Sequence, residues 1–210
     1  KSNCSGKDQI MTYILTPPQI RNNPAPEYKI KNWGLTDKIV EDLHKWVEEY
    51  QPLQKAGYVT EGNDEHDDEL RSTQISWIDS NTNPELHNLL GGVIHHANDT
   101  LYKYSITYLE TLQYSVYNAE DKGHYSMHSD AGLKGVNNDS RKISFSVLLN
   151  DPKEFEGGTL TLRPDSIGYP IELEKYEIVF FPSWMPHMVT PVTKGTRKTL
   201  VGWVHGPDFV

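Results

Sequence analysis

Two stretches in the second half of the chain decide its fold. Residues 123–130 read GHYSMHSD, and residues 181–204 read FPSWMPHMVTPVTKGTRKTLVGWV. Short runs rich in β-branched and aromatic residues predict strands at 73–78, 112–117, 125–130, 143–149, 159–162, 177–181 and 198–204. Gly, Pro, Asn and Ser predict turns between them, at 132–138, 157–158, 164–168, 182–183 and 194–195. Short strands joined by polar turns predict a jelly roll, that is, a double-stranded β-helix.

The first half predicts two helices that would cover this jelly roll. The first, at 36–50, begins with Thr36 as N-cap and has apolar residues at a helical period: Ile39, Val40, Leu43, Trp46, Val47 and Tyr50. The second begins at Asn83 and Pro84, and its apolar stripe extends to Leu101. We therefore expect a single, mostly β domain with helices (α+β) at 11–210, with helical support at about 30–104 and the jelly-roll core at about 105–210.

Composition excludes several classes of function. The 210 residues carry 29 acidic against 20 basic side chains, a net charge of −9, which disfavours nucleic acid as a partner because binding to it depends on neutralising phosphates. Cys4 is the single cysteine, so a disulfide within the chain and a cysteine-based zinc site are both excluded. The longest apolar run, 178–181, is too short to span a membrane. No leader pattern is evident, so we expect a cytoplasmic protein, with 1–10 as a non-native or disordered lead before Met11.

The triplet His128-Ser129-Asp130 indicates a metal site. In a strand, residues two apart face the same side, so His128 and Asp130 can reach one ion. The best third ligand is His187, which follows the strand at 177–181 and the turn at 182–183. Two histidines and one carboxylate that leave coordination positions open are typical of non-haem iron(II) oxygenases.

A second triplet, His66-Asp67-Asp68, shows that the motif alone has low specificity. It lies in the acidic stretch 61–69, which has no strand around it. We interpret this copy as part of a solvated loop.

Arg197 and Thr199 predict a carboxylate site beside the metal. Arg197 lies at the head of the strand predicted at 198–204, and alternation brings Thr199 to the same face. A guanidinium binds a carboxylate with two parallel hydrogen bonds, and a neighbouring hydroxyl can add a third. The pair would therefore bind the far end of a dicarboxylic acid. The alternative is a structural arginine paired with Asp or Glu.

These residues resemble the prolyl-4-hydroxylase-like (PKHD-type) oxygenases that depend on iron(II) and 2-oxoglutarate. The resemblance covers about 114–209 and rests on three motifs: Tyr117 with Gly123–Asp130; Arg141, Leu149-Asn150 and Gly157-Gly158-Thr159; and Phe181-Pro182-Ser183, His187–Val192 and Gly195-Thr196-Arg197, with Trp203 in the last strand.

The resemblance implies iron(II), 2-oxoglutarate as cosubstrate, and O2, with ascorbate as an accessory reductant. It implies that His128, Asp130 and His187 bind the metal, that Arg197 and Thr199 bind the C5 carboxylate, and that Tyr117 and Tyr125 assist. Core packing is the alternative for the two tyrosines. Several members carry Tyr where this chain has Leu148, a departure that leaves more of the carboxylate binding to Thr199, or else to Tyr117 and Tyr125.

The activity implied is prolyl 4-hydroxylation of a protein or peptide, with release of succinate and CO2. Other readings stay open: oxidation of another amino-acid residue or a free small molecule, a metal-binding module without catalysis, a zinc hydrolase, or a nucleic-acid demethylase. The last usually has a second Arg six residues after the first, where this chain has Trp203. The loop 131–140 and the acidic stretch 61–69 would border the metal and favour a proline-containing peptide with flanking Lys or Arg. The alternative is that the acidic stretch is a solvated loop that only keeps the protein soluble. The oligomeric state is not predicted.

Overall fold

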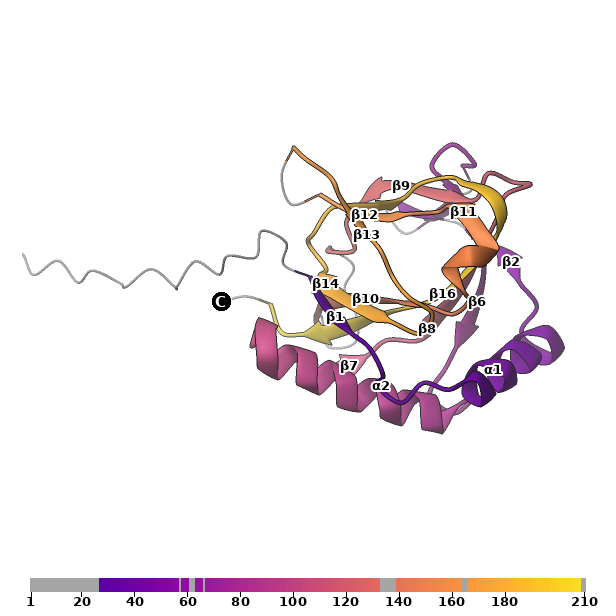
Figure 1. Ribbon diagram of the computed structural model, residues 1–210. Coiled ribbons are helices and arrows are strands. Elements are labelled where there is room, and N and C mark those ends of the chain that lie inside the picture. The colour runs from indigo at the N-terminus through magenta and orange to yellow at the C-terminus, as the bar shows by residue number, and fades with distance from the viewer. Residues whose placement is uncertain are drawn as a thin grey trace, which may run out of the picture.

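In the computed structural model (Figure 1), the described residues are 27–208 without 57, 61–62, 66, 133–138 and 164–165. Only the backbone is described at 58–60 and 63–65. The predicted lead at 1–10, His66 and the middle of the loop 131–140 therefore lie outside the described residues.

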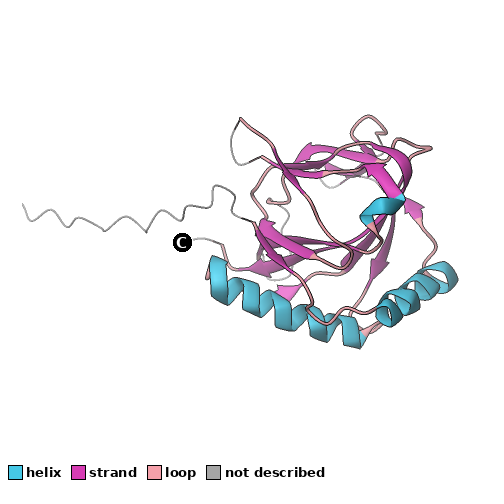
Figure 2. Ribbon diagram, in the orientation of Figure 1, coloured by secondary structure: helices cyan, strands magenta, loops and turns pink. Residues whose placement is uncertain are grey.

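Two antiparallel sheets face each other and form the predicted jelly roll (Figures 1 and 2). The larger sheet runs, in spatial order, through β1 (Tyr28–Ile30), β14 (Ile178–Pro182), β10 (Ser140–Leu148), β16 (Val192–Gly206), β8 (Leu112–Asn118), β6 (Gln74–Ile78) and β2 (Gln54–Lys55). Two further strands pair with β16, namely β7 (Tyr108–Leu109) and β11 (Phe155–Gly157). The smaller sheet contains β13 (Tyr169–Ile171), β12 (Leu160–Leu162), β15 (His187–Val189), β9 (His124–His128) and β5 (Arg71–Ser72). A separate hairpin joins β3 (Tyr58–Thr60) to β4 (Asn63–Glu65).

Both predicted helices form and cover the outer face of the larger sheet (Figure 2). Helix α1 (Asp37–Tyr50) begins where the Thr36 hydroxyl accepts the amide of Ile39 at 3.4 Å. Helix α2 (Pro84–Ala97) begins where the Asn83 side chain accepts the amide of Leu86 at 3.0 Å. Each cap satisfies an amide that has no partner within its helix.

Two details of the helix prediction were wrong. Tyr50, expected on the buried face of α1, is 62% exposed because it lies in the last turn. Helix α2 ends at Ala97, and Leu101 belongs to a π-helical turn, η1 (Asn98–Tyr102), which ends at Lys103 with φ 57°. Lys103 thus has the left-handed conformation that terminates helices.

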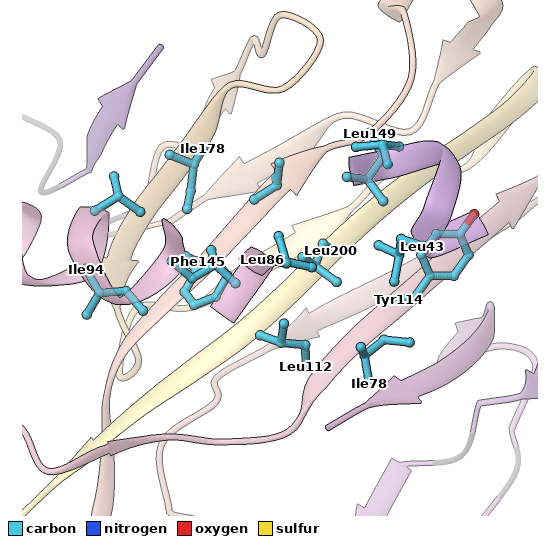
Figure 3. Packing of buried hydrophobic residues seen from close by; sticks show 14 of the residues in the cluster. Leu43, Ile78, Leu86, Ile94, Leu112, Tyr114, Phe145, Leu149, Ile178 and Leu200 are labelled. Atoms are coloured by element: carbon cyan, nitrogen blue, oxygen red, sulfur yellow. The ribbon is translucent and has the colours of Figure 1, made fainter. Parts of the chain in front are cut away.

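Strand β10 divides the core into two parts by the alternation of its side chains. Ile143, Phe145 and Val147 join the outer core beneath the helices, whereas Leu148 packs in the inner core between the sheets. The outer core includes residues from both helices and from five strands. Figure 3 labels several of them, among them Leu43, Ile94, Leu112, Phe145, Ile178 and Leu200. This alternation leaves Ser144 and Ser146 to face the space where the site forms.

The last strand, β16, differs most from the prediction. The turn expected at 194–195 lies inside a continuous strand, where Gly195 has φ +69°. A Cβ at Gly195 would meet the carbonyl oxygen of Glu154, next to β11, which pairs with β16. Arg197 is therefore inside the strand and not at its head, and β7, β11 and β13 were not predicted. No helix among the described residues is long and apolar enough to cross a membrane.

Candidate active site

The three predicted metal ligands come together at one end of the smaller sheet. His128, the last residue of β9, lies opposite His187, the first residue of β15, in the register of the two strands. Asp130 lies between them, with Oδ1 3.8 Å from His128 Nε2 and Oδ2 3.5 Å from His187 Nε2. One ligand atom from each residue lies within 4.8 Å of the other two, and no other such group of three occurs among the described residues.

Asp130 is held by a loop and not by the strand that was predicted to carry it. Strand β9 ends at His128, and Ser183 then fixes the chain because its carbonyl oxygen accepts the amides of Asp130 and Ala131, both at 3.0 Å. The Ser144 hydroxyl donates to Asp130 Oδ2 at 2.7 Å and also lies 3.0 Å from the Ser183 hydroxyl. Long-range contacts with two residues of the larger-sheet region therefore orient the carboxylate.

Backbone carbonyl groups fix the tautomer of both histidines. The Nδ1–H of His128 donates to the carbonyl of Ser126 at 2.8 Å, and that of His187 donates to Met185 at 2.9 Å. Nε2 of each ring is thereby left without a proton, and it lies on the side of Asp130. Its lone pair is free to bind a metal there.

The protonation states of His128 and Asp130 also suit a cation. Burial, together with the neighbouring His187, lowers the pKa of His128 to about 4, so its ring is neutral at pH 7. Burial alone would raise the pKa of Asp130, but His187, His128 and the Ser144 hydroxyl hold it below its usual value. Two imidazoles and one carboxylate are a ligand set that fits a divalent transition metal.

A cavity of about 520 Å³ connects the triad to the predicted carboxylate site. All four predicted cosubstrate residues line it: Tyr117, Tyr125, Arg197 and Thr199. Tyr117 and Arg197 face each other across β8 and β16, with the guanidinium carbon 5.4 Å from the tyrosine ring centre. The two histidines of the triad thus lie on the smaller sheet, and Arg197 and Thr199 lie on the larger one.

Arg197 and Thr199 have the properties of a site for an anion. Arg197 is 4% exposed, burial lowers its pKa, and no carboxylate of the described residues forms an ion pair with it. The Thr199 hydroxyl is fully buried and has no hydrogen-bond partner among the described residues. Buried polar groups are rarely left unpaired, so the dicarboxylic acid predicted from the sequence fits these two side chains. Within the part of the chain that the structure describes, the alternative of a structural Arg pairing with Asp or Glu is not observed.

Aromatic rings and two further arginines complete the walls of the cavity. Tyr125 stacks on the ring of His128 at 3.6 Å, and the Arg71 guanidinium lies 4.4 Å from the centre of the Tyr125 ring. Arg141 lies 3.9 Å from the centre of the Trp203 ring. No role was predicted for Arg141 from the sequence, and Arg71 was not identified. The only local signal for Arg71 is its place just before the strand predicted at 73–78.

Glu110 fixes the position of Arg141 in this wall. Its two carboxylate oxygens accept hydrogen bonds from Arg141 at 2.8 and 2.7 Å, and His205 Nε2 lies 2.8 Å from Oε2. Burial would raise the pKa of Glu110, but Arg141 and His205 hold it below its usual value. Glu110 was not identified from the sequence because its partners lie 31 and 95 residues away.

The described part of the acidic stretch does not face the metal. Asp67, Asp68 and Glu69 are absent from the lining of the cavity, and Asp68 pairs with Lys55 at 2.6 Å. The charged side chains that do line it are basic, apart from Asp130: Lys55, Arg71, Arg141 and Arg197. The predicted attraction for a basic peptide therefore has no support from the described residues.

Comparison with known proteins finds a family match over the second half of the chain. Residues 112–205, which contain the triad, Arg197 and Thr199, match the model of the 2OG-Fe(II) oxygenase superfamily. This part of the chain belongs to that superfamily. The predicted family is thereby confirmed, and iron(II), 2-oxoglutarate and O2 are the cofactor and cosubstrates that it implies.

Curated relatives of this oxygenase domain are PKHD-type hydroxylases. That of Crocosphaera subtropica is 35% identical over 136 residues, covering 63% of this chain and 60% of the relative. That of Gloeothece citriformis is 42% identical over 82 residues, covering 38% and 36%. The chain thus spans 60% or less of the length of these relatives.

Solved structures confirm the jelly-roll fold. A Pseudomonas putida prolyl-4-hydroxylase superposes with a TM-score of 0.64 at 20% identity, covering 88% of this chain and 95% of the other. A Trichoplax adhaerens prolyl hydroxylase, in complex with a hypoxia inducible factor oxygen degradation domain peptide fragment, gives 0.66 at 20% identity, covering 87% and 84%.

Proposed function

We propose that the protein is an iron(II)- and 2-oxoglutarate-dependent dioxygenase that hydroxylates a prolyl residue in a peptide or protein. The observation that carries this proposal is the shared cavity, in which the His128, Asp130 and His187 triad faces a buried Arg197 that has no carboxylate partner among the described residues. When bound together, the metal, 2-oxoglutarate and O2 supply the oxidation, in which one oxygen atom enters the substrate as hydroxyl and the other enters succinate as CO2 is lost.

The residues of the chain would bind, orient and shield the reactants. His128 and His187 would present Nε2 to the metal, and Ser144 and Ser183 would hold Asp130 in place. Arg197 and Thr199 would bind the C5 carboxylate, with Tyr117 beside them. The Tyr125 ring packed against His128 would keep bulk water from one side of the metal, which strengthens electrostatic contacts inside the cavity.

The substrate assignment rests on the relatives and on the apolar rim of the cavity. The rim includes Leu70, Trp77 and Met127, which are 41%, 42% and 38% exposed. Exposed apolar side chains beside a cavity are typical of binding sites, and a proline ring is an apolar group of suitable size. Another amino-acid residue or a free small molecule remains the alternative substrate.

The other readings of the sequence receive less support. A zinc hydrolase needs a general base near the open coordination position, and Asp130 is the only carboxylate among the described residues that line the cavity. A demethylase would need a second arginine at position 203, where Trp203 instead packs against Arg141. That the chain forms one domain at 11–210 and that it acts in the cytoplasm both stay predictions.

The decisive experiment measures succinate release from 2-oxoglutarate against a panel of peptides, after anaerobic loading with iron(II). We expect turnover that depends on a proline-containing peptide, with a mass gain of one oxygen on proline. His128→Ala, Asp130→Ala and His187→Ala should each abolish turnover, whereas His66→Ala should retain it. Release of succinate with no peptide oxidised would move the substrate to another class, and binding of metal without any 2-oxoglutarate turnover would favour a non-catalytic module.

A further inference from the structure

A second cavity, of about 500 Å³, adjoins the one that contains the triad. The two cavities share two lining residues, Leu160 and Arg197. The shared arginine is the residue assigned to the far carboxylate of 2-oxoglutarate. At the carboxylate end of the cosubstrate site, the second cavity thus lies directly behind the side chain of Arg197.

Leu148 and Thr199 are neighbours that line different cavities. Leu148 in β10 lies opposite Thr199 in β16, so their side chains are neighbours on one face of the sheet. Thr199 lines the first cavity, and Leu148 lines the second. A larger side chain at position 148 would fill the second cavity beside Arg197, whereas Leu148 leaves that space open.

Gly158 packs directly against Arg197. A Cβ at Gly158 would lie 2.9 Å from Cδ of Arg197, so the aliphatic part of the arginine rests on the backbone of residue 158. Gly158 has φ +61°, a conformation that other residues rarely adopt. No carboxylate of the described residues pairs with the guanidinium, so no ion pair among them holds Arg197 away from the second cavity, which it also lines.

The second cavity does not itself offer a place for an anion. Glu177, which is 4% exposed, lines it and accepts the amide of Glu174 at 2.9 Å. Of the two lysines on its lining, Lys31 pairs with Glu174 and Lys29 donates to the carbonyl of Glu172. A carboxylate would therefore stay with Arg197, and the second cavity would give space for that pair to move back.

We propose that the cosubstrate site accepts a 2-oxo dicarboxylic acid one methylene longer than 2-oxoglutarate. The size of the side chain at position 148, here Leu148, determines how long an acid the site can bind. The inference rests on the proposed function. With 2-oxoadipate, the substrate C–H bond and O2 would give the alcohol, while the keto acid loses CO2 and takes up the second oxygen atom to become glutarate.

Binding can be measured without turnover, by calorimetry on the full chain loaded with manganese(II) under nitrogen. We expect wild-type protein to bind 2-oxoadipate within about tenfold of 2-oxoglutarate, since a methylene group changes affinity by about tenfold or more when a pocket has no room for it. Leu148→Phe should lower the affinity for 2-oxoadipate relative to 2-oxoglutarate by about tenfold or more. Leu148→Ala should change the same ratio in the opposite direction, which a general loss of folding cannot do.

Leu149→Phe is the matched control, because it makes the same substitution at the adjacent residue, which packs in the outer core beneath the helices. It should leave the ratio of the two affinities unchanged. Wild-type protein that binds 2-oxoglutarate but binds 2-oxoadipate more than about tenfold more weakly would overturn the length inference and leave the proposed function standing. So would equal ratios in the Leu148→Phe and Leu149→Phe variants. Binding of neither acid would overturn both.

Discussion

Arg197 is the residue on which the cosubstrate assignment depends. Arg197→Ala should weaken 2-oxoglutarate binding by roughly tenfold or more, because a charge-assisted hydrogen bond contributes about 1.5–3 kcal/mol. Arg197→Lys should recover part of this as a point charge without the two-pronged geometry. Calorimetry on the metal-loaded variants measures the effect. Lys194→Ala, on an exposed residue of the same strand, is the control, and equal affinities in wild type and Arg197→Ala would place the carboxylate elsewhere.

Glu110 gives the protein a predictable response to acid. Its pKa in the folded state lies below the usual 4.5, so the unfolded chain binds more protons at acid pH. The stability that Glu110 contributes is therefore present above about pH 4.5 and is lost as the pH falls through its folded pKa. Glu110→Gln should be less stable than wild type at pH 7, and this difference should shrink on acidification.

Urea denaturation between pH 3 and pH 7 measures this response, with Glu156→Gln, which removes an exposed ion pair with Lys194, as the control. A Glu110→Gln variant whose stability falls in parallel with wild type would show that the carboxyl has no depressed pKa.

The candidate metal ligands could be proposed from local sequence, but the residues that orient them could not. His128 and His187 stand in motifs that can be read within a few positions of the chain. Ser144 reaches Asp130 across 14 residues, and Glu110 reaches His205 across 95. Such contacts depend on the pairing of distant strands, which a single sequence does not reveal.

At the scale of elements, the long strand β16 shows where prediction failed. Lys194-Gly195 has the composition of a turn, yet the strand continues through it. The left-handed Gly195 pairs with β11, and the pairing of β11 with β16 is irregular. A glycine in a turn and a glycine in a bulge give the same signal in sequence. The starts of the helices were predicted more closely, because the side chains of Thr36 and Asn83 accept hydrogen bonds from amides only three residues away.

Gly195→Ala tests the role of this glycine. The added Cβ would meet the carbonyl of Glu154 and disfavour φ +69°, so we expect a loss of at least about 1–3 kcal/mol of stability. Gly91→Ala in α2 is the matched control, because nothing lies within 4 Å of a Cβ there, and it should stabilise the protein by about 0.5–1 kcal/mol. Thermal unfolding compares the two, and a neutral Gly195→Ala would show that the strand can be re-formed without a glycine.

At the scale of the whole molecule, the helices and the site lie on opposite faces of the larger sheet. Leu86 in α2 is fully buried in the outer core and does not line the cavity. Leu86→Ala should therefore lower the free energy of unfolding by about 2–5 kcal/mol while the affinity for 2-oxoglutarate stays unchanged. Urea denaturation and calorimetry on the same preparation check both parts. A large loss of affinity would mean that the helical layer sets the geometry of the cavity.

The division of the site between the two sheets has a mechanical consequence. The two histidines of the triad are on the smaller sheet and Arg197 is on the larger one. A ligand bound at both ends would therefore bridge two layers that otherwise meet through side chains. Such a bridge should make separation of the two sheets less frequent. It should therefore slow amide hydrogen exchange in β9, β15 and β16 together. Acetate, which can occupy only one end, should protect one sheet at most. Equal protection by acetate and by 2-oxoglutarate would show that the two layers move independently of what lies between them.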